Sequence, residues 1–219
     1  MRKLNSSPLI ILSSLLAIAF ILFTVLVVNG QILNLDNYFY RNYTLEVGIL
    51  YYLCRFMAYL YIPIIFLLIY LFIHFKRKQQ KYEMIFLFTS LAGWILSEWI
   101  LKPIFRIPCP PTYYHDILSK EIYRIPFIHN IGLKETCYPS GHTTSYIVLC
   151  GYLLYVNLNY TKSIFWRKIF STLLIAIILL IGPSRIILGT HWFSDVVAAY
   201  LLGFSLLLSI FSLRLFKSK

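Results

Sequence analysis

Two histidines in this sequence stand beside groups that could help them act on phosphorus. His142 directly follows Ser140 and Gly141 in "CYPSGH", and His191 lies four residues before Asp195 in "PSRIILGTHWFSD". At this spacing on a helical turn, the carboxylate can hydrogen-bond the imidazole and fix its tautomer. A neutral imidazole is a competent nucleophile toward phosphorus, and a second histidine can protonate the departing alkoxide. The two histidines therefore suit phosphoryl transfer, with nucleophile and acid roles divided between them.

Three cationic residues lie near these histidines in the sequence or at the face of the membrane where the histidines are predicted to lie. Lys102, Arg106 and Arg185 could neutralise an anionic ligand such as phosphate. The Ser140 hydroxyl and the Gly141 N–H are hydrogen-bond donors, and a helix starting just after them would add partial positive charge. Fixed cations and N–H donors can stabilise a transferring phosphoryl group without a metal or another cofactor. We therefore expect neither a metal ion nor another cofactor.

The same residues also have purely structural explanations. Ser140 and its neighbours could form a turn with a helix cap, and Asp195 could cap the last helix, with Ser194 as the competing cap. Glu98 lies one helical turn before Lys102 and could simply pair with it. A phosphate site explains all of these positions at once, because they fall on one predicted face of a membrane.

The elements that must position these residues are apolar helices. The chain has 219 residues, of which 59% are hydrophobic and only 13% charged, too few to form the polar shell of a soluble domain. Apolar runs near twenty residues long instead predict helices that cross a bilayer. We expect an all-α bundle of six transmembrane helices, over residues 8–28, 52–74, 84–101, 143–158, 168–188 and 195–215.

The basic residues are distributed unevenly between the two sides of this topology. Twelve of the twenty basic residues share one side with a single acid, Glu83: Arg2, Lys3, Lys76, Arg77, Lys78, Lys81, Lys162, Arg167, Lys168, Arg214, Lys217 and Lys219. The positive-inside rule places that side, and with it both termini, in the cytoplasm. The net charge of +12 is thereby explained as a topology signal, and we expect no nucleic-acid partner.

The outer side carries the candidate chemistry. Residues 29–47 are expected to be a short external loop, and 102–142 a large one that contains six of the nine prolines. The polar clusters 98–111, 137–142 and 183–195 all lie at this face. We interpret residues 1–219 as one membrane-embedded domain, with its motifs within 98–195.

Four cysteines occur, two in predicted spans and two in the large loop. Cys54 and Cys150 are expected to act as small hydrophobic residues. Cys109 and Cys137 would lie outside the cytoplasm, where a disulfide between them is favoured. A zinc site using them with a loop histidine lacks the usual ligand spacing.

Two stretches resemble signature motifs of a known family. "PSGH" (139–142) and "SRIILGTHWFSD" (184–195) are similar to the second and third motifs, PSGH and SR-x5-H-x3-D, of the type-2 phosphatidic-acid phosphatase superfamily. With the six-span topology, the resemblance to the membrane-bound lipid phosphatase branch extends over roughly residues 84–210. It implies that His191 is a nucleophile forming a phosphohistidine, that Asp195 orients it, and that His142 protonates the leaving group. It further implies that Ser140, Gly141 and Arg185 hold phosphate oxygens.

The family's first motif, K-x6-R-P, is matched only in part. Lys102 and Pro110 fit, but Cys109 stands where the family has arginine. Arg106 could swing into the phosphate pocket and replace the missing charge. Alternatively, Cys109 pairs with Cys137 and staples the first motif to the second; the two explanations are compatible. A third possibility is lost activity, although losing one donor would cost only about 2–4 kcal/mol of transition-state stabilisation.

The resemblance implies a membrane lipid phosphatase that hydrolyses a lipid phosphate monoester or pyrophosphate at the outer face of a bacterial cytoplasmic membrane. Its partners would be that lipid and the bilayer. Candidate substrates among bacterial relatives include undecaprenyl pyrophosphate, phosphatidylglycerol phosphate, phosphatidic acid and lipid A. The alternatives are a lipid phosphotransferase using the same phosphohistidine and a non-catalytic lipid-binding member of the family.

Overall fold

The computed structural model describes residues 6–44, 48–58, 92–93, 95–111 and 136–216. Within these ranges the chain is helical and contains no β-strand, apart from one isolated bridge between Pro108 and Thr136. The elements are α1 (Ser6–Val28), α2 (Leu33–Tyr43), α3 (Ile49–Ala58), the π-helical turn η1 (Leu96–Leu101), α6 (Lys102–Phe105), α9 (Gly141–Tyr160), α10 (Ile164–Ile187) and α11 (Phe193–Phe216).

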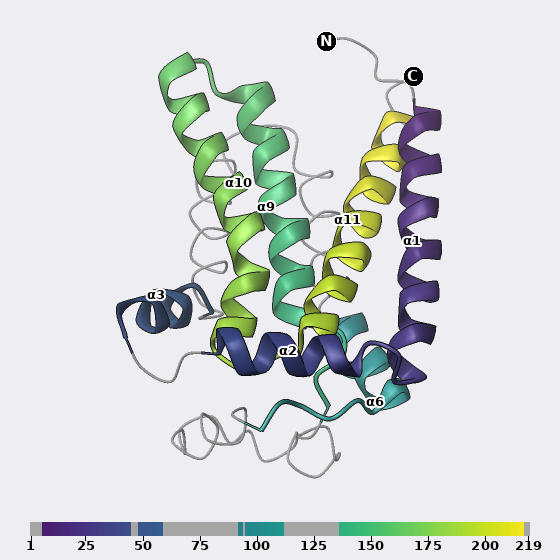
Figure 1. Cartoon of the computed structure of the whole chain (residues 1–219). Helices are drawn as coiled ribbons and strands as arrows, with labels where there is room; N and C mark the ends of the chain where they lie inside the picture. The colour runs from purple at the N-terminus through teal and green to yellow at the C-terminus, as the bar shows by residue number, and fades with distance from the viewer. Residues whose placement is uncertain (1–5, 45–47, 59–91, 94, 112–135, 217–219) are drawn as a thin grey trace.

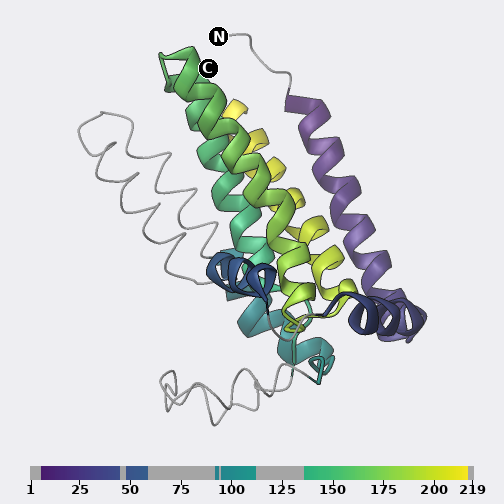
Figure 2. The same cartoon turned by 60° about the vertical axis from the view of Figure 1, so that its left-hand side comes forward.

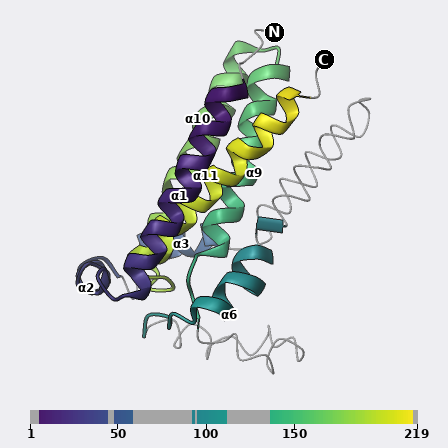
Figure 3. The same cartoon turned by 90° about the vertical axis from the view of Figure 1, so that its right-hand side faces the viewer.

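Four long helices, α1, α9, α10 and α11, form a bundle, and α2 lies across one of its ends (Figure 1). Helix α1 runs beside α11, whereas α9 packs against both α10 and α11 (Figures 2 and 3). The first turns of α9 and α11 and the last turn of α10 meet at the end that α2 covers. The topology therefore brings two separated stretches, 137–142 and 183–195, together.

Small and polar residues allow the bundle helices to approach closely. Gly151 of α9 faces the Leu207 side chain of α11, so closely that a Cβ at this position would collide with it. Ser205 of α11 donates a hydrogen bond to the Ser13 carbonyl of α1 at 3.0 Å. Small residues and interhelical hydrogen bonds of this kind are typical of helix pairs in membranes.

Within the described residues, three helices are long and apolar enough to cross a membrane: Ser7–Val28, Ile164–Ile187 and Phe193–Ser212. Their large apolar side chains point outward in many places, as at Leu22 and Leu179, each 61% exposed. Because water would not favour such surfaces but a bilayer would, the chain is an integral membrane protein. Helix α9 is long enough to cross but is less apolar, and most of it is buried between its neighbours.

The expected spans 8–28, 143–158, 168–188 and 195–215 coincide with long helices whose ends differ by a few residues. The expected span 52–74 is described only up to residue 58, and most of 84–101 also lies outside the described residues. The six-span count and the cytoplasmic location of both termini therefore stay predictions.

Both segments expected to be outer loops contain helical residues that the sequence analysis did not predict. Residues 29–47 contain the 11-residue helix α2, in which Asp36, Phe39 and Tyr40 lie on one face and contact residues 192–194 at the bundle end. The large loop 102–142 begins with four further helical residues, since α6 continues the helical path of η1. Residues 112–135 of that loop lie outside the described residues.

Candidate active site

The chain reaches His191 through a tight turn at the end of α10. Gly189 has a positive φ of 63°, which glycine adopts without strain. The Gly189 N–H donates to the Ile186 carbonyl at 2.9 Å, and the Thr190 N–H donates to the Arg185 carbonyl at 3.1 Å. This pair of bonds is a Schellman motif, which ends the helix and reverses the chain. His191 directly follows Thr190, whose N–H is held by the Arg185 carbonyl, so the turn fixes where the histidine leaves α10.

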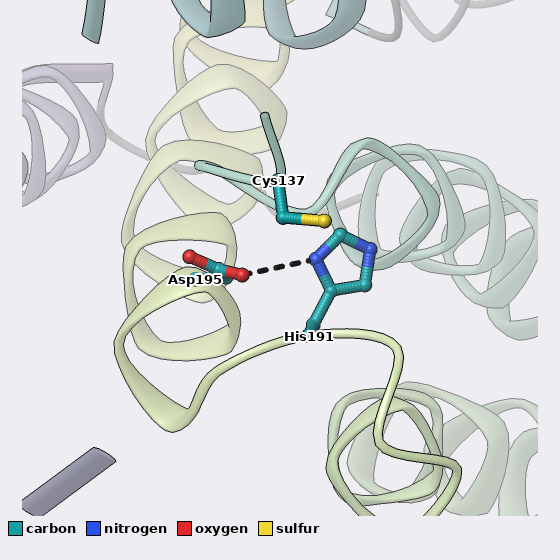
Figure 4. A group of neighbouring side chains, drawn as sticks. All are labelled: Cys137, His191 and Asp195. Carbon is teal, nitrogen blue, oxygen red and sulfur yellow. Dashed lines mark hydrogen bonds and ion pairs between the residues drawn. The ribbon is translucent and has the colours of Figure 1, made fainter. Parts of the chain in front are cut away.

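Asp195 holds both the histidine and the start of α11. Its Oδ2 lies 3.2 Å from His191 Nδ1 (Figure 4). The same oxygen accepts the Trp192 N–H at 3.0 Å. The second bond closes the helix start as the third-position residue of a capping box does. When Nδ1 carries the proton and donates it to the carboxylate, Nε2 keeps its lone pair. Asp195 therefore acts as helix cap and ring partner together, two roles that the sequence presented as alternatives.

The surroundings of His191 keep its ring uncharged. Burial lowers the pKa of His191 well below its usual value, and the nearby charges of Arg185 and Lys102, with His142, lower it further. A hydrogen bond with the Cys137 backbone acts in the opposite direction. The ring is therefore in its neutral, nucleophilic form at neutral pH. Arg185 comes from the third cluster and Lys102 from the first, so charges from both clusters act on this histidine.

The second motif is joined to the third through the backbone. The Ser140 N–H donates to the Asp195 carbonyl at 3.1 Å. Ser140 is the N-cap of α9, with its Oγ 3.5 Å from the Thr143 N–H, so the expected cap is present. Gly141 is the first helical residue and is buried, whereas His142 keeps part of its surface exposed. The start of α9 therefore contacts the His191–Asp195 pair, and the side chain of His142 stays partly exposed.

The first motif meets the second where Lys102 follows the π-helical turn η1. Such turns are often found at functional sites. Lys102 is buried, and its Nζ lies 2.6 Å from Glu98 Oε2, which is the pairing expected as the structural alternative. The Glu98 carboxylate lies directly against Gly141, where any Cβ would collide with it. Gly141 therefore permits close contact between the ion pair and the start of α9.

Of the two explanations for the missing arginine, the structure contains the disulfide but does not turn Arg106 toward the site. Arg106 is exposed, adopts a left-handed φ of 50°, and donates from Nε to the Pro103 carbonyl at 3.2 Å. Cys109 and Cys137 form a disulfide with a Cα–Cα distance of 5.0 Å. The Cys137 N–H also donates to the Ile107 carbonyl at 3.0 Å. The disulfide thus links the first motif covalently to the second, whereas the Arg106 guanidinium lies at the surface and is hydrogen-bonded to the Pro103 carbonyl.

One group of described residues has the composition of a metal site. Potential ligand atoms of Cys137, His191 and Asp195 lie within 4.8 Å of one another (Figure 4). The Cys137 sulfur, however, is bonded to Cys109 and cannot provide the thiolate that zinc prefers. With the disulfide formed, only an imidazole and a carboxylate that already bind each other remain.

Two residues that support the site were not singled out in the sequence. Asp36 of α2 accepts hydrogen bonds from Ser194 of α11; burial raises the pKa of this carboxyl, and the Ser194 bonds oppose that change. Tyr138 is fully buried with its hydroxyl 2.7 Å from Thr24 Oγ1 of α1, and burial raises the pKa of the phenol. Asp36 is the single acidic residue in 29–44, and this was the one signal that the sequence offered for it.

The class of molecule is defined by this arrangement: an all-helical membrane protein in which three separated segments gather histidines, cations and a carboxylate at one end of its bundle. The chain belongs to the PAP2 superfamily, whose family model matches residues 82–219. This result confirms the family resemblance of the motifs.

The fold is shared with a solved structure. A transmembrane PAP2-type phosphatidylglycerolphosphate phosphatase from Bacillus subtilis superposes with a TM-score of 0.72, covering 94% of this chain and 97% of that chain at 16% identity. Comparison with curated proteins finds no significant sequence match. At this identity the structural likeness shows the fold alone.

Proposed function

We propose that this chain is a membrane lipid phosphatase that works through a phosphohistidine on His191. The observation that carries the proposal is the buried His191–Asp195 pair, with Nδ1 turned to the carboxylate and the cations Arg185 and Lys102 nearby. A neutral imidazole with Nε2 as its available nitrogen, in a cationic site, is suited to attack a phosphate ester or pyrophosphate.

The reaction would proceed in two balanced steps. In the first, His191 Nε2 forms a bond to phosphorus as the bond to the leaving oxygen breaks, and His142 gives that oxygen a proton. In the second, His142 takes a proton from water, whose oxygen attacks the phosphohistidine and displaces Nε2 as inorganic phosphate forms. Asp195 stabilises the ring while it carries positive charge. Arg185, Lys102 and the Gly141 N–H would neutralise the phosphoryl oxygens.

Ser140 would contribute differently from its expected direct role. Its side chain caps α9 and pairs with Thr143 Oγ1 at 3.0 Å, and the residue is fully buried. We therefore assign Ser140 the task of fixing the helix start, so that the Gly141 amide and the positive helix end point at phosphate.

The substrate class follows from the membrane location of the site. The reacting groups lie at the end of a bundle whose flanks are apolar, so a phosphate on a lipid headgroup could reach them while its chains stay in the bilayer. The basic-residue distribution favours the outer face. The Bacillus subtilis protein of the same fold is described as acting on phosphatidylglycerol phosphate, which makes that lipid a natural first candidate.

The decisive test is phosphate release from a lipid panel by purified protein in the presence of a metal chelator. The panel contains phosphatidylglycerol phosphate, phosphatidic acid, a prenyl pyrophosphate and lipid A. We expect release from at least one lipid, and a loss of about 10⁴-fold or more in the His191→Ala variant. Equal release by wild type and variant, or none from any lipid, would overturn the proposal and favour a non-catalytic protein. Labelled phosphate appearing on an added lipid acceptor would instead indicate transfer.

A further inference from the structure

Helix α2 is tied to the start of α11 by a carboxylate from a distant part of the chain. Asp36 Oδ1 accepts the Ser194 N–H at 2.8 Å, and Asp36 Oδ2 accepts the Ser194 hydroxyl at 2.7 Å. Both residues are buried. A buried carboxylate that receives two hydrogen bonds from one residue fixes that residue's position closely.

Ser194 occupies a sensitive place in the helix. It is the second residue of α11 and directly precedes Asp195. The first N–H groups of a helix have no partner within it and need an acceptor from elsewhere. Asp36 satisfies the Ser194 N–H and also places negative charge at the positive end of α11. Without it, the Ser194 N–H would lose its acceptor at the helix start that also carries Asp195, the partner of His191.

Aromatic contacts hold α2 in register with the same stretch. Phe39 stacks on Phe193 with ring centroids 4.2 Å apart and planes 5° apart. Tyr40 lies against Trp192, with centroids 5.5 Å apart. One face of α2 therefore contacts three consecutive residues, 192–194, between the nucleophile candidate and its carboxylate partner.

We propose that Asp36 is a positioning residue: by capping α11 through Ser194, it holds the first turn of α11, and with it the Asp195 carboxylate, in place to orient His191. Its two hydrogen bonds go to Ser194 and not to His191 or Asp195, so its proposed effect on the ring is indirect. This inference rests on the proposed function for its kinetic test, but its geometric content can be measured independently of turnover.

The kinetic test compares two substitutions at the position with a control on the same helix. Asp36→Ala leaves the two Ser194 donors without their acceptor, and we expect kcat to fall about tenfold to hundredfold with KM nearly unchanged. Asp36→Asn can still accept the Ser194 N–H and donate to its hydroxyl, so it should keep most of kcat. The control is Asn42→Ala, since Asn42 is exposed and bonds only within α2, to the Tyr38 carbonyl.

The independent readout is the ¹⁵N spectrum of the imidazoles in protein labelled at its five histidines. The His191 signals are assigned by their loss in His191→Ala. We expect Asp36→Ala to shift the His191 nitrogen resonances and Asn42→Ala to leave them in place. Unchanged His191 resonances in Asp36→Ala would overturn the inference.

Three kinetic results would also overturn it: an unchanged kcat in Asp36→Ala, an equal loss in Asn42→Ala, or a rise in KM alone. If wild-type protein releases no phosphate from any lipid, the proposed function fails, and the spectral comparison still decides whether Asp36 sets the ring. Should Asp36→Ala not fold, Ser194→Ala provides the second variant. It removes one of the two bonds, and we expect a smaller shift of the same His191 signals.

Discussion

The third polar cluster, residues 183–195, and the first, 98–111, reach the same site but are held there by different means. The third cluster is fixed by local geometry: the Schellman turn at Gly189 and the hydrogen bond that the Trp192 N–H donates to the Asp195 carboxylate. The first is fixed by a covalent bond, the Cys109–Cys137 disulfide, and by the Lys102–Glu98 ion pair.

This difference matches the chemistry expected of each cluster. A nucleophile and its orienting carboxylate must be aligned within a fraction of an ångström, which short-range hydrogen bonds in a tight turn provide. A cation that neutralises phosphate acts over a longer range and tolerates a looser position. The departure from the family motif at Cys109 falls in the cluster that can better tolerate it.

After the loss of His191 itself, the largest effect should come from Asp195→Asn, also in the third cluster. The amide is nearly isosteric, but it lacks the negative charge that would stabilise the His191 ring while the ring carries positive charge. We expect kcat to fall about 10³–10⁴-fold in the phosphate-release assay. Because the two residues would act as a unit, adding Asp195→Asn to His191→Ala should cause little further loss. A decrease below tenfold would contradict the assignment.

In the first cluster, removing the disulfide should mainly lower stability. We expect Cys109→Ser with Cys137→Ser to lower the free energy of unfolding by about 2–4 kcal/mol, measured by denaturant titration in detergent. The free cysteines Cys54 and Cys150 offer the control, since changing them to alanine breaks no covalent link. Free thiols at 109 and 137 in protein isolated without reductant would show that the staple is absent.

The turn in the third cluster should be moderately sensitive. Gly189→Ala forces a Cβ into the left-handed region and should cost about 1–2 kcal/mol of stability. Gly30 ends α1 in the same motif with a φ of 73°, so Gly30→Ala gives the matched stability cost away from His191. If the turn positions the nucleophile, Gly189→Ala should also lower kcat by more than Gly30→Ala. Equal kcat in the two variants would assign the turn a structural role only.

The smallest effect should come from Arg106→Ala. Because its guanidinium is exposed and bonds to the Pro103 carbonyl, we expect kcat and KM to stay within about twofold, as for most exposed side chains. Lys102→Ala is the contrasting variant in the same cluster and should lose about 10²-fold in kcat. A comparable loss in Arg106→Ala would show that Arg106 does move in to replace the arginine absent at position 109.

Some of the site could be predicted from the sequence because its contacts are local. The His191–Asp195 pair spans four residues, a distance at which helical geometry alone brings side chains together. The long apolar runs likewise predicted the long bundle helices, since a bilayer imposes their length. Cys109 and Cys137 could be paired because they were the only cysteines outside predicted spans.

Other features depended on how the bundle packs. Asp36 and Ser194 are separated by 158 residues, and no periodicity in 29–47 indicated that this segment would lie across the start of α11. The direction of Arg106 was equally open, because a flexible side chain can point either way from the same backbone. The contact of Glu98 with Gly141 likewise required two helices to meet.

The amino-acid sequence by itself determined the family, the apolar helices and the pairing of His191 with Asp195, since each depends on composition or on neighbours within a few residues. The tertiary structure alone decided which distant groups support that pair, notably Asp36 at the start of α11 and the backbone bond from Ser140 to Asp195. The physical reason is range: local geometry follows from bond rotations near each residue, whereas contacts between helices depend on the packing of the whole bundle.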